Sequence, residues 1–250
     1  MTNFWTIIHR VLRDADILLI VLDARMISHT RNIEIEQKVQ DTGKPYIYVI
    51  NKSDLIDKTT ANAYAKQIPH SVFISAKNHQ GTSFLREKIQ IYAARAGHKG
   101  EVKVGVLGYP NVGKSSIINA LSGRSAAPVS SISGFTRGLK HVRATAKILL
   151  LDTPGVIPYL EKNDLKHAII GTIDYAKEKE PDMVVAHLIK EFPSIIETHY
   201  GVKKRRNPHD TIESIAEKRK LVAKGGIPDV QRAARMILKD WQTGKIVRKF

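Results

Sequence analysis

The sequence predicts an α/β fold with a mostly parallel sheet, followed by a small all-helical domain. In the first part of the chain, short apolar runs rich in β-branched residues or leucine alternate with helical patterns. After about Pro158 no run of that quality recurs, and helix-period segments separated by Pro and Gly take over. The 250 residues suffice for one large domain and a smaller companion. We therefore expect domains at residues 1–162 and 163–250.

The expected elements follow one another as right-handed crossovers require. The runs expected as buried parallel strands are Ile17–Leu22, Tyr46–Ile50, Val72–Ile74, Val102–Leu107 and Ile148–Leu151. Helical patterns between them cover Ile33–Asp41, Ala61–Gln67, Ser83–Ala94 and Lys114–Leu121. His141–Ala146 is expected as an antiparallel edge strand. The helices expected in the C-terminal domain are Leu165–Lys179, Met183–Lys190, Ser194–His199, Thr211–Ala223 and Val230–Thr243.

The composition favours a polyanionic partner. Lys and Arg number 40 against 24 Asp and Glu, a net charge of +16, and neutralising phosphates with such a surplus releases condensed counterions. The alternative is a solvated basic surface, while a membrane surface is disfavoured because no basic amphipathic helix carries aromatic anchors. The absence of cysteine excludes disulfides and cysteine-ligated zinc. With no run long enough to cross a bilayer and no signal peptide, we expect a soluble, cytoplasmic monomer with no membrane contact.

A phosphate-binding loop is the strongest motif. Gly108-Tyr-Pro-Asn-Val-Gly113-Lys114-Ser115 matches G-x-x-x-x-G-K-[ST] between an expected strand and an expected helix. The glycines let backbone N–H groups converge on phosphate oxygens, Lys114 reaches the β- and γ-phosphates, and Ser115 ligates Mg²⁺. A chance strand–glycine turn is the alternative for this motif alone. The phosphate contacts expected here come from Asn111, Val112, Gly113, Lys114, Ser115 and Ser116.

Two further segments fit the chemistry of the γ-phosphate. In Asp152-Thr-Pro-Gly155 an acid ends an apolar strand, where a contact to Mg²⁺ is expected, and the Gly155 N–H is placed to sense the γ-phosphate. The motif alone is also good turn chemistry. In the polar loop Ser131-Ile-Ser-Gly-Phe-Thr136, Thr136 is the candidate for the second hydroxyl on Mg²⁺, ahead of Ser133 and Ser131. Lys114, Thr136 and Gly155 are thus the candidate catalytic residues.

The base-reading motifs come earlier in the chain. Asn51-Lys52-Ser-Asp54 follows an apolar strand. The Asp54 carboxylate accepts from N1–H and the exocyclic amine of guanine, a donor pair that adenine lacks. Asn51 bridges to the glycine loop, and the Lys52 stem lies over the base. After another strand, Ser75-Ala76-Lys77 offers backbone N–H groups to guanine O6. Together, these motifs predict that GTP and GDP are the ligands, with Mg²⁺ as cofactor.

The order of these motifs predicts a circularly permuted Ras-like P-loop domain. In an ordinary Ras-like domain the phosphate loop comes first, but here the two base-reading motifs precede it and D-T-P-G comes last. Permutation keeps the sheet and relocates the termini. The segment after Gly155 therefore leads directly into the helical domain, so a change at the γ-phosphate is expected to move that domain.

With these motifs the sequence resembles the circularly permuted GTPases of the YlqF/RbgA class, over nearly the whole chain. The resemblance includes, besides the motifs above, Asp14-Ala-Asp-Ile17, Val21-Leu-Asp-Ala-Arg25, Thr30-Arg31-Asn32, Ala216-Glu-Lys-Arg219, Gly225-Gly226, and Arg232 to Lys245. It implies a role in assembly of the large ribosomal subunit or its precursor, with the helical domain on ribosomal RNA. The basic residues expected to contact RNA phosphates are Lys203, Lys204, Arg205, Arg206, Arg232, Arg235, Lys239 and Lys245; a solvated helix face is the alternative for each.

Three positions bear on hydrolysis. Val156 stands where Ras-like enzymes place the glutamine that orients the attacking water, so slow hydrolysis is expected. Bacterial members of the class use a His in an N-terminal Gly-His-Met segment, which this chain lacks; His9 is nearby, but its spacing to the first strand is shorter and favours a structural role. Asn111 matches the residue that binds potassium in related GTPases, which makes K⁺ a candidate ligand.

The resulting hypothesis is a slow GTPase switch that is stimulated by docking on the large ribosomal particle. One alternative is a GTP-regulated RNA-binding module in which hydrolysis is incidental. Another is an RNA-modification GTPase with a catalytic partner, which the permuted order disfavours.

Overall fold

The computed structural model describes residues 4–123, 139–155, 157 and 163–248. The chain divides into two units, Met1–Lys162 and Asn163–Phe250, called here the first and the second unit. Thr136, Ser131, Ser133 and Val156 lie outside the described residues. None of the helices in the described part is long and apolar enough to cross a membrane.

The first unit is built on a six-stranded sheet with the order β3-β2-β1-β4-β6-β5. Its strands are β1 (Ile17–Asp23), β2 (Tyr46–Asn51), β3 (Ser71–Phe73), β4 (Val102–Gly108), β5 (Lys140–Thr145) and β6 (Ile148–Asp152). Five strands run parallel, and β5 pairs with β6 antiparallel at the edge. The predicted α/β fold and its antiparallel edge strand are confirmed.

The strand register brings the motifs to one edge of the sheet. Asp23 at the end of β1 lies opposite Asn51 at the end of β2. On the other side of β1, Val21 pairs with Gly108, and β4 in turn pairs with the strand that ends at Asp152. Because parallel strands share a carboxyl edge, the loops that follow them meet there, where ligands of open α/β sheets bind.

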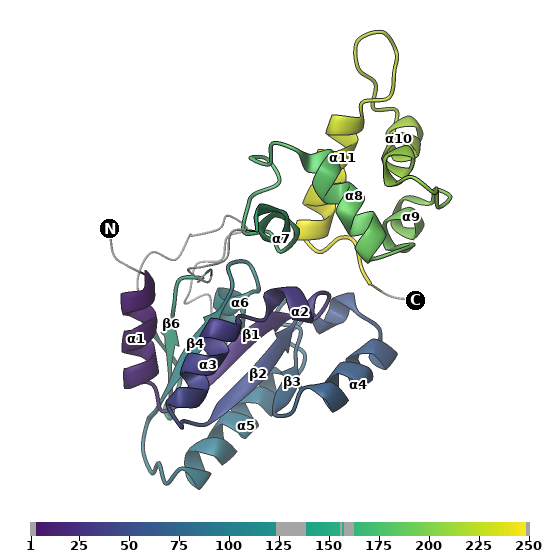
Figure 1. The fold of residues 1–250 in the computed structure, drawn as a ribbon. Helices are drawn as coiled ribbons and strands as arrows, with labels where there is room; N and C mark the ends of the chain where they lie inside the picture. Colours follow the sequence, from purple (N-terminus) through teal and green to yellow (C-terminus); the bar gives the residue numbers. More distant parts are fainter. Residues whose placement is uncertain (1–3, 124–138, 156, 158–162, 249–250) are drawn as a thin grey trace. The chain divides into compact units, whose positions relative to one another are not determined.

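Helices cover both faces of this sheet (Figure 1). The helices of the first unit are α1 (Phe4–Asp14), α2 (Ile27–Thr30), α3 (Ile33–Asp41), the 3₁₀ turn η1 (Ser53–Leu55), α4 (Lys58–Gln67), α5 (Thr82–Arg95) and α6 (Lys114–Ser122). The first two of these helices, α1 and α2, were not expected from the sequence. Helix α1 is amphipathic and buries Ile8, Val11 and Leu12, and the Lys44 ammonium donates to the carbonyls of Leu12, Arg13 and Ala15 at its end, at 2.8, 2.6 and 2.7 Å.

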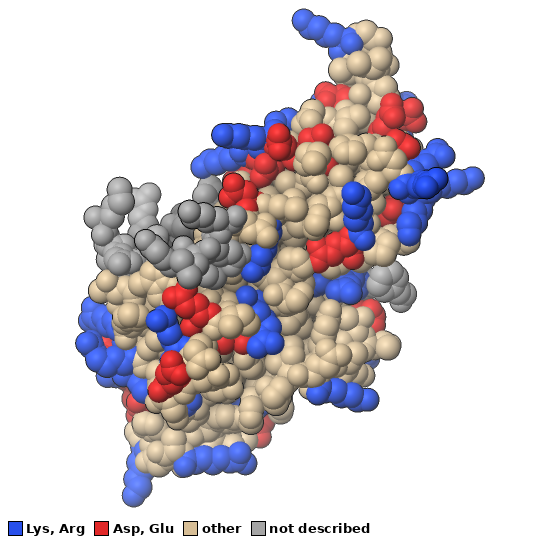
Figure 2. All heavy atoms as spheres, in the orientation of Figure 1, with Lys and Arg blue, Asp and Glu red and all other residues tan. Residues whose placement is uncertain are grey.

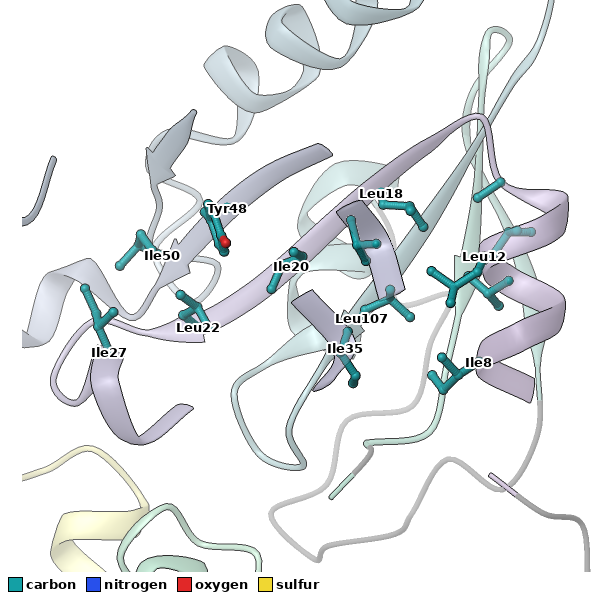
Figure 3. Close-up of a cluster of buried hydrophobic side chains, with 14 of the residues drawn as sticks. Ile8, Leu12, Leu18, Ile20, Leu22, Ile27, Ile35, Tyr48, Ile50 and Leu107 are labelled. Atoms are coloured by element: carbon teal, nitrogen blue, oxygen red, sulfur yellow. The ribbon is translucent and has the colours of Figure 1, made fainter. Parts of the chain in front are cut away.

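One hydrophobic cluster joins α1 and α3 to the sheet (Figure 3). Ile8 and Leu12 of α1 and Ile35 of α3 pack with alternate residues of β1, Leu18, Ile20 and Leu22. Side chains one position out of step on β1, such as Leu19 and Val21, are equally buried, because a strand alternates its side chains between two covered faces. This explains why β1 is apolar throughout, and it fixes the strand ends that carry the site.

The second unit is helical in its described residues. Its helices are α7 (Asp164–Ile169), α8 (Pro181–Glu191), α9 (Ile195–Tyr200), α10 (Pro208–Lys218) and α11 (Val230–Gln242). Trp241 of α11 is fully buried, lies 5.1 Å from the Phe192 ring between centroids, and donates through Nε1 to the Ile169 carbonyl at 3.0 Å. These contacts tie α11 to the end of α7 and to the end of α8.

Two of the expected C-terminal helices differ from the structure. The expectation for Leu165–Lys179 is wrong beyond Ile169, because Gly171 has a φ of 78° and the chain then turns. The expected Thr211–Ala223 helix begins earlier, at Pro208, and ends at Lys218. Lys220 then takes a left-handed conformation, with a φ of 54°, and Val222 bridges to Pro228 in an antiparallel turn.

Candidate nucleotide-binding site

The glycine loop connects β4 to α6. Helix α6 begins at Lys114, directly after Gly113, which has a φ of 96°. A Cβ atom at position 113 would lie 2.2 Å from the Asn51 side-chain nitrogen, so only glycine fits. Asn111 also has a positive φ, 61°, and Val112 is buried while Ser115 and Ser116 are half-buried. The loop thus presents the start of a helix to the sheet's carboxyl edge, as a phosphate site requires.

Lys114 is held inside this loop. Its side chain is buried, and the ammonium donates to the carbonyls of Gly108 and Tyr109 at 3.0 and 2.7 Å. Burial lowers the pKa of Lys114 to about 8, while Asp152 acts in the opposite direction. The side chain therefore stays largely protonated at neutral pH, and its cation is available to phosphate oxygens.

Asp152 has the surroundings of a metal ligand. It is fully buried at the end of β6, and neither carboxylate oxygen has a hydrogen bond of normal geometry among the described residues. Burial raises its pKa above the usual range, against the opposing effects of Lys114, Lys140 and the Ser115 hydroxyl. A buried carboxylate of this kind beside a hydroxyl fits a hard cation such as Mg²⁺, which prefers oxygen ligands. Ser115 and Asp152 are thus the described residues that fit this ion.

Gly155 lies against the glycine loop. A Cβ atom at this position would come within 2.5 Å of the Pro110 Cα, so a side chain would displace one backbone or the other. The D-T-P-G segment is anchored just before it, where the Thr153 hydroxyl donates to the Val106 carbonyl at 2.6 Å. This contact brings the last motif of the chain to the loop that is expected to hold the phosphates.

Asn51 joins the base-reading motifs to the glycine loop. Its Nδ2 donates to the Val112 carbonyl at 2.9 Å, and its Oδ1 accepts from the Ala76 N–H at 3.1 Å. The side chain is buried. Three segments that are far apart in the sequence, N-K-S-D, S-A-K and the glycine loop, therefore meet at one amide.

The remaining base-reading residues surround this amide. Asp54 lies half-buried on η1. Ser75 N–H pairs with the Gln80 carbonyl and Ala76 N–H with Asn51, which leaves the amide of exposed Lys77 for guanine O6. Of the three amides expected to serve the base, the Lys77 N–H is therefore the one that stays a candidate for guanine O6.

Behind these loops lies a charged cluster that the motifs did not reveal. Asp23 and Arg25 are each 1% exposed; Nε and Nη2 of Arg25 donate to the carboxylate at 3.2 and 2.9 Å. The Lys52 ammonium lies 2.8 Å from the same carboxylate. Burial alone would raise the pKa of Asp23, but Arg25 and Lys52 together hold it well below its usual range. In the sequence, the run Val21 to Arg25 is part of the resemblance but carries no assigned role.

His9 and the basic residues expected to contact RNA are exposed. His9 lies edge-on to Trp5 on α1, with the ring centroids 6.4 Å apart. In the second unit the residues expected to contact RNA are exposed without exception: Lys203, Lys204, Arg205, Arg206, Arg232, Arg235, Lys239 and Lys245. Lys245 pairs with Asp240 at 3.0 Å, and the Lys239 ammonium lies 5.7 Å from the Tyr175 ring centroid. On the face drawn in Figure 2, basic and acidic side chains are interspersed.

The sequence is similar to those of known GTP-binding proteins. A family described as "50S ribosome-binding GTPase" matches residues 103–223. An uncharacterised GTP-binding protein of Methanocaldococcus jannaschii is 40% identical over 96% of this chain and 65% of its own length. Nucleolar GTP-binding protein 2 of Neurospora crassa is 33% identical over 98% of this chain and 41% of its own length. The chain thus spans less than two thirds of either relative.

Solved structures share the fold. GNP-bound YlqF from T. maritima superposes with a TM-score of 0.66 at 22% identity, covering 96% of this chain and 94% of YlqF. The GDP-bound form of the same protein gives a TM-score of 0.65 at 24% identity, covering 96% of each chain.

Proposed function

Since the chain has the motif order and the fold of the circularly permuted GTPases of the YlqF/RbgA class, we propose that it is a slow GTPase that acts as a switch in assembly of the large ribosomal subunit. Docking on the ribosomal particle stimulates hydrolysis. Residues 1–162 form the GTPase domain, and residues 163–250 contact ribosomal RNA. The protein works as a cytoplasmic monomer, away from membranes.

The observation that carries this proposal is the double hydrogen bond of Asn51, which draws the base-reading and phosphate-binding loops together. Asp54 then reads guanine beside Asn51 and Lys52, and in the Ser75-Ala76-Lys77 segment the Lys77 N–H meets guanine O6. The phosphates lie against the glycine loop from Asn111 to Ser116. A single site of this composition selects guanine over adenine, because adenine lacks the donor pair and would leave the Asp54 carboxylate without its hydrogen-bond partners.

Catalysis in this site is mostly positioning and charge neutralisation. Lys114 places a cation beside the β- and γ-phosphates, and the Gly155 N–H meets the γ-phosphate. Ser115, Asp152 and, from outside the described residues, Thr136 hold Mg²⁺, which neutralises charge on the phosphates when bound. Asn111 is a candidate ligand for K⁺. Val156 has no group that orients water, so hydrolysis by the free protein is slow.

GTP hydrolysis by the purified protein tests this function. We expect a slow rate in potassium buffer, a lower rate when sodium replaces potassium, and strong stimulation by isolated large ribosomal subunits. Small subunits serve as the control and should have little effect. A rate that neither subunit changes would contradict the stimulated switch, and equal rates in sodium and potassium would remove K⁺ from the site.

Val156 favours one alternative, a GTP-regulated RNA-binding module in which hydrolysis is incidental. Thr136→Ala, which removes an expected Mg²⁺ ligand, distinguishes the two functions. If turnover releases the protein, the variant with bound GTP should accumulate on large-subunit particles in sucrose gradients. If binding state alone matters, the variant and the parent should distribute alike.

The exposed arginines of α11 give a separate prediction about RNA. Arg232 and Arg235 are both exposed and lie three positions apart, on one side of the helix. We expect Arg232→Gln/Arg235→Gln to weaken binding to ribosomal RNA and to reduce the slope of log affinity against log salt by about 0.7–0.9 for each phosphate that the variant no longer neutralises. Fluorescence anisotropy at several salt concentrations measures both effects. Lys66→Gln and Lys58→Gln, on exposed positions of α4, form the charge-matched control, and equal weakening in both pairs would leave only nonspecific attraction.

A further inference from the structure

Removing the charges of Asp23, Arg25 and Lys52 from water costs free energy. Apolar side chains could fill the same space without that cost, so packing alone does not explain why charged residues stand here. Buried ion pairs contribute little net stability compared with apolar residues of similar size. In addition, Lys52 has a φ of 62°, a left-handed conformation that residues other than glycine rarely adopt. Backbone strain and buried charge at the end of a strand are typical of groups held for function.

We propose that Asp23 and Arg25 are positioning residues for the guanine base: Arg25 fixes the Asp23 carboxylate, which in turn holds the Lys52 ammonium and keeps the Lys52 stem extended beside the base. This inference rests on the proposed guanine-nucleotide site. It assigns a role to two residues at the end of β1, neither of which belongs to a nucleotide motif.

The Asp23 carboxylate is immobilised from several sides. Besides the two guanidinium contacts, its Oδ1 accepts from the Arg25 backbone N–H at 3.0 Å. The Asp23 N–H donates to the Thr30 hydroxyl at 3.1 Å, and the Ala24 N–H donates to the Asn51 carbonyl at 2.8 Å. The ends of β1 and β2 are therefore locked together. A carboxylate held in this way fixes the position of the ammonium that it binds.

Lys52 has a second anionic neighbour. Burial lowers the pKa of Lys52, Asp23 opposes this shift most strongly, and Asp54 opposes it as well. Asp54 is the carboxylate that the guanine ring needs. Without Asp23, the Lys52 ammonium would turn toward Asp54 and compete with the base for its oxygens. Asp23 thus keeps Lys52 extended and keeps Asp54 available.

Calorimetric titration of the full chain with GDP and with pyrophosphate tests this role. We expect Asp23→Asn to weaken GDP binding by about 10- to 100-fold, by analogy with the loss found when a group that orients a metal-binding side chain is removed. Pyrophosphate, which lacks the base, should bind within about twofold of the parent. Asp16→Asn is the matched control: Asp16 directly precedes the first residue of the same strand, at the end far from the site, where its carboxylate accepts from the Lys103 N–H at 2.8 Å.

A double-substitution comparison identifies Lys52 as the intermediary. In a Lys52→Met background, Asp23→Asn should cause little further decrease in GDP affinity, because the group through which Asp23 acts is gone. If Asp23→Asn does not fold, Arg25→Gln is the second variant. It keeps the Asp23–Lys52 ion pair, whose charges cancel, and should still weaken GDP binding more than pyrophosphate binding.

Three outcomes separate the hypotheses. Unchanged GDP affinity in Asp23→Asn or in a folded Arg25→Gln chain would overturn the positioning role. Equal weakening of GDP and pyrophosphate would also overturn it, since it indicates general damage to the site. If the parent chain itself binds no GDP, the proposed function fails, and the failure does not depend on Asp23.

Discussion

Asp54→Asn should weaken GTP and GDP binding by about two to four orders of magnitude. The carboxylate is expected to accept two hydrogen bonds from guanine, each worth about 1.5–3 kcal/mol because the acceptor is charged, and every 1.4 kcal/mol is about tenfold in affinity. Asp54 lies half-buried on η1, two residues after Lys52. Titration with a fluorescent GDP analogue measures the decrease.

Xanthine nucleotides supply the matched control for this substitution. Xanthine carries a carbonyl where guanine has its exocyclic amine, so the carboxamide of the variant donates where the Asp54 carboxylate accepted. The variant should therefore bind XDP more tightly than GDP, reversing the preference of the parent. A variant that binds both nucleotides equally poorly would show that Asp54 supports the fold and does not read the base.

Asn51→Ala should lower both the stability of the first unit and its affinity for GDP. The substitution leaves the Val112 carbonyl and the Ala76 N–H without their partner. Each buried unpaired group costs about 1–3 kcal/mol, so the free energy of unfolding should fall by about 2–6 kcal/mol. Urea unfolding followed by circular dichroism measures this change.

The control for Asn51→Ala is Asn62→Ala on α4, where the side chain is exposed. It should change the free energy of unfolding by less than about 0.5 kcal/mol. If Asn51→Ala lowers stability but leaves GDP affinity intact, the three loops would be shown to meet without help from this amide, and the site would depend on the strand ends alone.

The fold was largely predictable because buried parallel strands are apolar along their whole length. β1 and β2 match the expected runs to within one residue, and the fold expected from the resemblance is shared by YlqF from T. maritima. Helix α1 was missed, although the helical spacing of Ile7, Ile8, Val11 and Leu12 is a signal that could have found it. Helix α7 was overextended because the break at Gly171 depends on a backbone conformation that local hydrophobicity does not indicate.

The nucleotide motifs were predictable for a different reason. Phosphate and base contacts need backbone and side-chain groups at fixed spacing, so they leave a pattern that local sequence shows. The Asp23–Lys52 pair has no such spacing, because it joins two strands whose register is set by the sheet. Thr136 and Val156 lie outside the described residues, so their roles stay predictions. The contacts of the other named residues with nucleotide and metal are predictions as well.

The two tryptophans of the chain lie in different units, Trp5 on α1 and Trp241 on α11. Trp5 is half-buried, whereas Trp241 is fully enclosed beside Phe192. An indole away from water emits at shorter wavelength, so the intrinsic fluorescence contains a separate component for each unit. A Trp5→Phe chain would report the melting of the second unit alone. A bound nucleotide stabilises the part that binds it, so these two emission components would show how far that stabilisation extends along the chain.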